Sequence, residues 1–134
     1  MTDKYEPSAG DLLRGENQVR VSAWVHLAFG KEAVTNPQER SMRAVEEVVE
    51  LAQVVGVTAE TLHRLVNYVF SRPVGTAESE VAGSMVTIYA AATSLNVNAD
   101  AALEKELVRL YQPEVLERCR RRQAEKRRAL VGIV

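Results

Sequence analysis

The sequence lacks the marks of several protein classes. It has 134 residues and a single cysteine, Cys119, which excludes an internal disulfide framework and is typical of a reducing compartment. Its first ten residues contain no apolar core of a signal peptide. No apolar run approaches the ~20 residues that a membrane-spanning helix needs. We therefore expect a cytoplasmic protein that has no membrane partner.

An excess of charge of one sign is also missing. The formal net charge of −1 gives no chain-wide attraction to nucleic acid or membrane. Basic residues are concentrated only in 118–128, where they could neutralise nucleic-acid phosphates. This stretch lacks interleaved aromatic residues and any recognisable reading motif. A solvated helix that also packs on a partner subunit is the favoured interpretation, and a nucleic-acid partner is not expected.

No alternation of polar and apolar residues predicts a β-strand, whereas helix start and stop signals recur along the chain. They predict helices at 11–29, 37–55, 58–71, 77–95, 98–111 and 113–128. Residues 1–10 are predicted to be a flexible leader, 31–35 a loop, and 113–134 a basic C-terminal helix with a loose tail. The prediction is a single all-α domain over 1–134, a helical bundle with about four core helices plus the basic helix.

Acidic residues gather on one side of the helix predicted at 37–55. At ~100° per residue, Arg43, Glu46, Glu47 and Glu50 fall within about a third of the circumference. Nearly all positions around them are apolar, so we expect a narrow acidic stripe on an otherwise buried helix. Mutual repulsion of the carboxylates would be relieved by a hard divalent cation such as Mg²⁺. The alternative is an ordinary solvated face rich in glutamate.

A second acidic position, Glu80, lies in the helix predicted at 77–95. Ser84 and Thr87 follow it on the same face, and Gly83 borders them. Small residues allow a ligand or another helix to come close. Tight helix packing without a ligand explains the same pattern.

These segments together resemble the paired motifs of the MazG-like all-α nucleoside triphosphate pyrophosphohydrolases. Glu46-Glu47-Val48-Val49-Glu50 is similar to the family's Glu-Glu-x-x-Glu motif, and Glu80-Val81-Ala82-Gly83 to its Glu-x-x-Asp motif. The stretches 39–43, 63–75 and 113–118 resemble a small phage and bacterial subgroup. The resemblance covers roughly residues 17 to 126.

The resemblance implies an enzyme that cleaves the α–β phosphate bond of a nucleoside triphosphate, releasing a monophosphate and pyrophosphate. It implies Mg²⁺, with Mn²⁺ as an alternative, held by Glu47, Glu50 and Glu80. Glu46 would be a further ligand or the catalytic base that orients water. A bound divalent ion both neutralises charge and acidifies water, so no separate nucleophile is required. The family's assembly also implies a homodimer or homotetramer, with the site walled partly by a second subunit.

Other side chains near the motifs are candidates for binding the substrate. Arg43, Arg64 and Arg72 could contact its phosphates, and Tyr68 could stack on its base. The alternative is that the arginines are solvated surface residues and Tyr68 belongs to the core.

Gly83 departs from the family pattern, because it stands where the second motif has aspartate and has no side chain to bind a metal. Either the glutamates suffice with additional waters, or the site is weakened. The sequence thus leaves open a nucleotide-binding or regulatory module without catalysis. A basic-tailed protein associated with nucleic acid is the second alternative.

Overall fold

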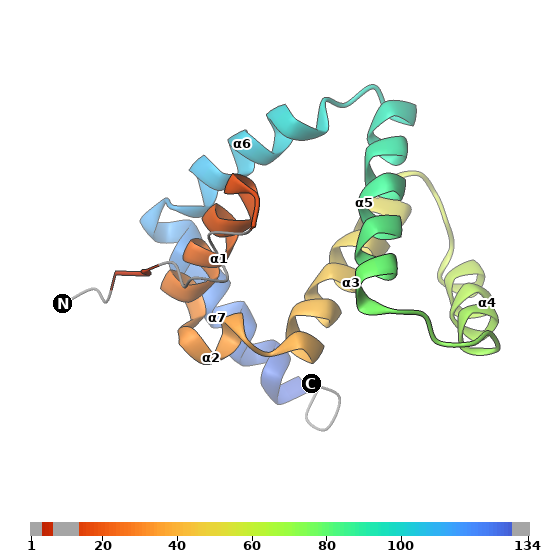
Figure 1. The fold of residues 1–134 in the computed structure, drawn as a ribbon, viewed down its shortest axis with the longest axis horizontal. Helices are drawn as coiled ribbons and strands as arrows, with labels where there is room; N and C mark the ends of the chain where they lie inside the picture. Colours follow the sequence, from red (N-terminus) through yellow and green to blue (C-terminus); the bar gives the residue numbers. More distant parts are fainter. Residues whose placement is uncertain (1–3, 7–13, 130–134) are drawn as a thin grey trace. The chain divides into compact units, whose positions relative to one another are not determined.

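The computed structural model describes residues 4–6 and 14–129, and within them it contains seven α-helices and no strand (Figure 1). The predicted all-α class is therefore confirmed. The helices are α1 (Glu16–Phe29), α2 (Lys31–Val34), α3 (Pro37–Val54), α4 (Ala59–Phe70), α5 (Ala77–Ser94), α6 (Ala99–Leu110) and α7 (Pro113–Ala129). None of these helices is long and apolar enough to cross a membrane.

Side-chain caps fix most helix starts where the sequence predicts them. The Thr58 and Thr76 side chains accept hydrogen bonds from backbone amides in the first turns of α4 and α5. Asn98 Oδ1 accepts one from the Ala101 amide at 2.9 Å at the start of α6. Each bond satisfies an amide that has no partner within its own helix. Just after the C-terminal end of α3, Gly56 has a φ of 82°, a left-handed conformation that favours glycine and stops the helix.

Two predicted boundaries are wrong. Arg14 and Gly15 are not helical, so the helix predicted at 11–29 is present only from Glu16 onward in the described residues, and positions 11–13 lie outside them. Residues 31–35 are not simply a loop, because Lys31–Val34 form the single turn α2. That turn buries Ala33 against the core, a tertiary gain that local sequence does not reveal. Of the predicted leader and tail, residues 1–3, 7–10 and 130–134 lie outside the described residues.

The chain divides into two compact units. The terminal unit combines Met1–Val45 with Lys105–Val134, and the middle unit is Glu46–Glu104. In the terminal unit Trp24, Val25, Ala28 and Ala33 form a core onto which α7 packs through Leu116 and Cys119. Trp24 Nε1 also donates to the Leu110 carbonyl at 3.0 Å, which ties α1 to the end of α6.

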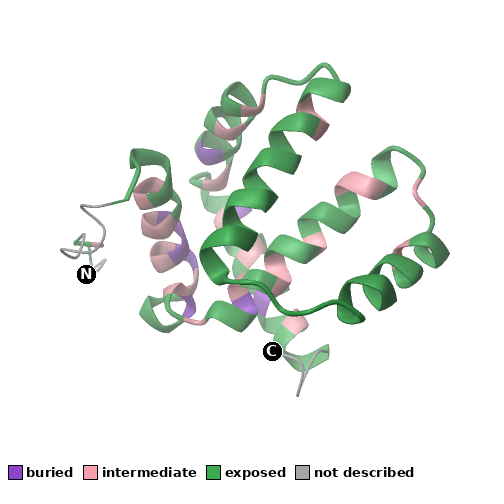
Figure 2. Ribbon diagram, turned by 45° about the vertical axis from the view of Figure 1, so that its right-hand side comes forward, coloured by how far each residue is buried: buried purple, intermediate pink, exposed green. Residues whose placement is uncertain are grey.

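The middle unit has a different character. Every buried side chain in the described part of the protein belongs to the terminal unit, whereas α4 and α5 are exposed along nearly their whole length (Figure 2). Sequence patterning predicts four core helices and a single domain, and both points stay predictions.

Candidate active site

The predicted acidic stripe lies on α3. Glu46 is partly exposed, and Glu47 and Glu50 are exposed. The expectation that the helix around them is otherwise buried is wrong within the chain, because Val48 and Val49 remain 48% and 41% exposed. An apolar pattern shows which face excludes water, but not which molecule covers that face.

Glu80 lies in the first turn of α5, where the positive end of the helix dipole favours a carboxylate. It lines a cavity of about 400 Å³ formed by the end of α4, the following link and the start of α5. A β-carbon added at Gly75 would overlap Glu80 Oε1. The absence of a side chain at Gly75 therefore allows the Glu80 carboxylate to rest against the link.

Two other predicted site residues lie at the same place. Arg72 lines the cavity together with Glu80. The guanidinium carbon of Arg72 is 5.4 Å from the centroid of the Tyr68 ring, within the range of a cation–π contact. The structure therefore brings an acid, a cation and an aromatic ring together at the corner between α4 and α5.

The remaining predicted phosphate contacts lie elsewhere. Arg64 forms an ion pair with Glu60 one turn earlier on α4, and it does not line the Glu80 cavity. Arg43 belongs to the terminal-unit part of α3, where its charge acts on Glu39 and Arg40.

The hydroxyls near Gly83 are used within α5. Ser84 Oγ donates to the Glu80 carbonyl at 2.7 Å, and Thr87 Oγ1 donates to the Gly83 carbonyl at 3.0 Å. Both are local side-chain-to-backbone bonds. A β-carbon at Gly83 would have no neighbour within 4 Å, so the position has room for the aspartate of the family motif.

The described residues contain no group of three or more acidic, histidine or cysteine side chains close enough to hold one metal ion. Glu80 and the three glutamates of α3 are thus not gathered around a common point in this single chain. Which of them bind a metal stays a prediction.

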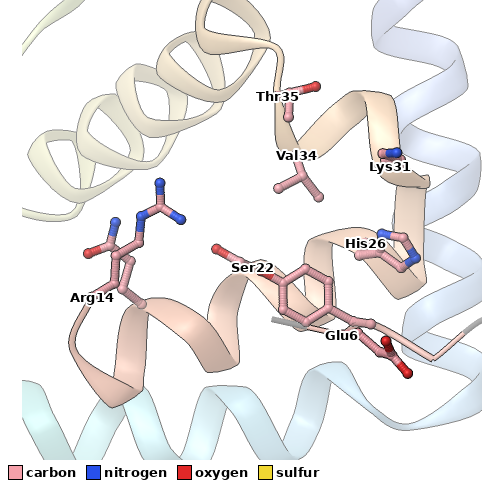
Figure 3. A pocket seen from close by; sticks show the side chains of 9 residues that line it. Glu6, Arg14, Ser22, His26, Lys31, Val34 and Thr35 are labelled. Carbon is pink, nitrogen blue, oxygen red and sulfur yellow. The ribbon is translucent and has the colours of Figure 1, made fainter. Parts of the chain in front are cut away.

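A different cavity, of about 470 Å³, lies in the terminal unit and contains none of the predicted site residues. Figure 3 shows Glu6, Arg14, Ser22, His26 and Lys31 around it. Its charged side chains carry both signs, so it has no single electrostatic preference.

Sequence reasoning missed the contacts around Glu39. Arg127 binds this buried carboxylate through two hydrogen bonds of 3.0 Å. The bonds from Arg127 hold the Glu39 pKa below its ordinary value, and the charges of Arg40 and Arg43 lower it further. The spacing from Asn36 does signal a capping box, and the Glu39 amide donates to Asn36 Oδ1 at 3.1 Å. No sequence signal connects Glu39 with Arg127 on α7.

Two arginines in the basic run of α7 have structural roles, because they bond to other parts of the terminal unit. Arg120 donates from Nε to the Ala28 carbonyl at 3.0 Å and from Nη2 to the Leu27 carbonyl at 2.8 Å. These bonds satisfy the carboxyl end of α1, where a cation is favoured. Arg120 and Arg127 therefore stabilise the terminal unit, and the composition of the run alone is no evidence for nucleic-acid binding.

Comparisons of the chain with family models, curated proteins and solved structures found no match. The resemblance to MazG-like enzymes rests on the motif residues themselves.

Proposed function

We propose that this protein is a Mg²⁺-dependent nucleotide pyrophosphohydrolase that cleaves nucleoside triphosphates between the α and β phosphates. The observation that carries the proposal is that Glu80 and Arg72 line one cavity while Arg72 also contacts the Tyr68 ring. A carboxylate suits a metal ion, a guanidinium suits a phosphate, and an aromatic ring suits a base.

The acidic stripe of α3 supplies the other half of the proposed chemistry. Glu47 and Glu50 act with Glu80 as ligands of Mg²⁺ or Mn²⁺, and Glu46 is a further ligand or orients the attacking water. Arg43 and Arg64 contribute positive charge toward the phosphates. Phosphoryl transfer depends mainly on positioning and charge neutralisation, for which carboxylate-bound Mg²⁺ and arginines suffice.

The exposed apolar surface of the middle unit supports a homodimer or homotetramer. On α4, the side chains at the helical spacing 62, 65, 66 and 69 form an apolar stripe, yet Leu65, Val66 and Val69 are each 52% exposed. On α5 no charged residue occurs from Val81 to Ser94, a composition typical of a helix covered on all sides. A second copy offers equally uncharged helices, so association would bury both sets and bring further acidic residues to the site.

The direct test is pyrophosphate release from a panel of canonical and modified nucleoside triphosphates, with Mg²⁺ and with Mn²⁺. We expect turnover to require the metal. We also expect it to be lost in a Glu47→Ala, Glu50→Ala double variant. Glu117→Ala is the control, because Glu117 is an exposed glutamate on α7 that belongs to neither motif. No turnover by folded, oligomeric protein, or unchanged Mg²⁺ affinity in the double variant, would contradict the proposal.

The second candidate is a nucleotide-binding module without catalysis, which Gly83 in the second motif favours. It predicts that a nucleoside triphosphate raises the melting temperature without releasing pyrophosphate. The two candidates share the binding residues and differ only in turnover.

A further inference from the structure

The cavity of about 400 Å³ beside Glu80 has an apolar wall as well as a charged one. All of its lining residues belong to the middle unit. Arg72 and Glu80 form the charged wall. The apolar wall is formed by Val69, Phe70, Pro73 and Val74. A cavity of this volume, lined mostly by apolar side chains with a few charged groups, is typical of a site for a small organic molecule.

Phe70 supplies the only aromatic ring in that wall. It is the last residue of α4, and at 85% exposure it is the most exposed aromatic residue in the part of the chain that the structure describes. Phenylalanine is among the residues most often buried in folded proteins. The apolar face of its ring is therefore open to a planar ligand that enters the cavity.

Tyr68, the base contact that the sequence predicts, lies differently. It does not line the cavity, and its ring centroid is 5.4 Å from the guanidinium carbon of Arg72. This cation–π contact positions Arg72 rather than filling the space beside Glu80.

Arg72 is the cation that the middle unit offers to a ligand in this cavity. That unit contains two arginines and no lysine, and its other arginine, Arg64, is paired with Glu60. A guanidinium group suits phosphate oxygens, whereas the neighbouring apolar wall has no charge to offer them. The two walls therefore favour a ligand with a flat apolar end and an anionic end.

We propose that Phe70 stacks on the base of a nucleoside triphosphate whose phosphates are held by Arg72. The inference rests on the proposed function and deepens it, because it assigns the base and the phosphates to different walls of one cavity. Stacking on an aromatic ring suits every nucleobase, since each has a π face. Phe70 is thus a substrate-binding residue, and Tyr68 is a positioning residue that acts through Arg72.

The test is calorimetric titration of the full chain in Mg²⁺ with two kinds of probe. The first is a set of nucleoside triphosphate analogues of the four bases, with a methylene group between the α and β phosphates to prevent cleavage. The second is inorganic triphosphate, which has no base. Phe70→Leu keeps an apolar side chain and removes the ring. We expect it to bind the analogues about tenfold more weakly and inorganic triphosphate as the wild type does.

Phe70→Trp keeps a ring and adds a spectroscopic signal. We expect the analogues to bind it at least as tightly as the wild type and to quench its added fluorescence, whereas inorganic triphosphate does not. The other tryptophan, Trp24, is buried in the terminal unit and provides a constant background.

Two further variants separate stacking from support of Arg72. Tyr68→Leu removes the ring beside the guanidinium, so it should weaken the analogues and inorganic triphosphate equally. Tyr111→Leu is the matched control, because Tyr111 is an exposed aromatic residue of the terminal unit that does not line this cavity. It should change neither affinity.

Three results would overturn the proposal: no binding of any analogue by the wild type, unchanged analogue binding by Phe70→Leu, or equal weakening of both probes by Phe70→Leu. The last result would mean that Phe70 supports the fold or the assembly. Pyrophosphate release separates this proposal from the proposed function. Turnover with an unchanged KM in Phe70→Leu would keep the enzyme and remove the base contact. Selective loss of analogue binding in Phe70→Leu, without turnover by the wild type, would keep the contact and remove the catalysis.

Discussion

At the scale of single residues, Gly75 determines where the Glu80 carboxylate rests. A methyl group at this position would meet the flexible end of Glu80 rather than backbone, so the carboxylate would move at little cost. We expect Gly75→Ala to change the free energy of unfolding by less than about 1 kcal/mol. If Glu80 is a metal ligand, the same change weakens Mg²⁺ binding about tenfold or more, as titration of the metal would show.

Val74 provides the matched control for that substitution, since its side chain is 99% exposed beside Gly75. Val74→Ala should leave both stability and Mg²⁺ affinity unchanged. Equal Mg²⁺ affinity in Gly75→Ala and Val74→Ala would argue against Glu80 as a ligand.

The ion pair of Glu39 predicts how stability depends on pH. Because bonds from Arg127 lower the folded-state pKa of Glu39 below 4.5, the unfolded chain binds the proton more readily. The resulting stabilisation is fully present above pH 4.5 and is lost as the pH falls through the lower folded-state value. We expect Glu39→Gln to cost about 2 kcal/mol at pH 7 and progressively less in acid, measured by urea unfolding.

Glu106 is the control for this pH dependence. Its pKa is also lowered by hydrogen bonds from its arginine partner, Arg109, but the two side chains are about half exposed. Solvent screening limits such a pair to about 0–1 kcal/mol. A Glu106→Gln variant as destabilised as Glu39→Gln would mean that burial does not strengthen the Glu39 pair.

At the scale of helices, α5 allows the missing motif aspartate to be restored. Nothing lies within 4 Å of a β-carbon at Gly83, and Gly83→Ala should stabilise the helix by about 1 kcal/mol through propensity alone. Gly83→Asp, compared with Gly83→Ala, isolates the effect of the carboxylate. A large gain in pyrophosphate release by the aspartate variant identifies a weakened enzyme, whereas no pyrophosphate release by either variant favours the binding module.

Most helix boundaries could be predicted because their causes are local. The caps at Thr58, Thr76 and Asn98 lie within three residues of the amides that they satisfy. The turn α2 could not be predicted, because burial of Ala33 depends on residues packed from α1. For the candidate site, the sequence indicated Glu80, Arg72 and Tyr68 individually. Their convergence depends on the path of the α4–α5 link, which no periodicity encodes.

At the scale of the whole molecule, the apolar stripe of α4 predicts assembly. Replacing Leu65 and Val66 by glutamate would place two charges where a second copy is proposed to pack. We expect the Leu65→Glu, Val66→Glu double variant to raise the dissociation constant at least about 100-fold, as measured by light scattering after size-exclusion chromatography. Because the middle unit buries no side chain of its own, circular dichroism should also show a loss of helix in the dissociated variant.

The opposite face of α4 supplies the control for assembly. Asn67 is exposed and lies about 200° around the helix from Leu65, on the polar side with His63 and Arg64. Asn67→Glu should therefore leave both the mass and the helix content unchanged. A wild-type protein that is monomeric and fully helical at micromolar concentration would refute the predicted interface, and the exposed valines and leucines of the middle unit would then need another partner. An oligomer that survives the double variant would place the contact on α5 instead, where the uncharged stretch from Val81 to Ser94 carries further exposed apolar side chains.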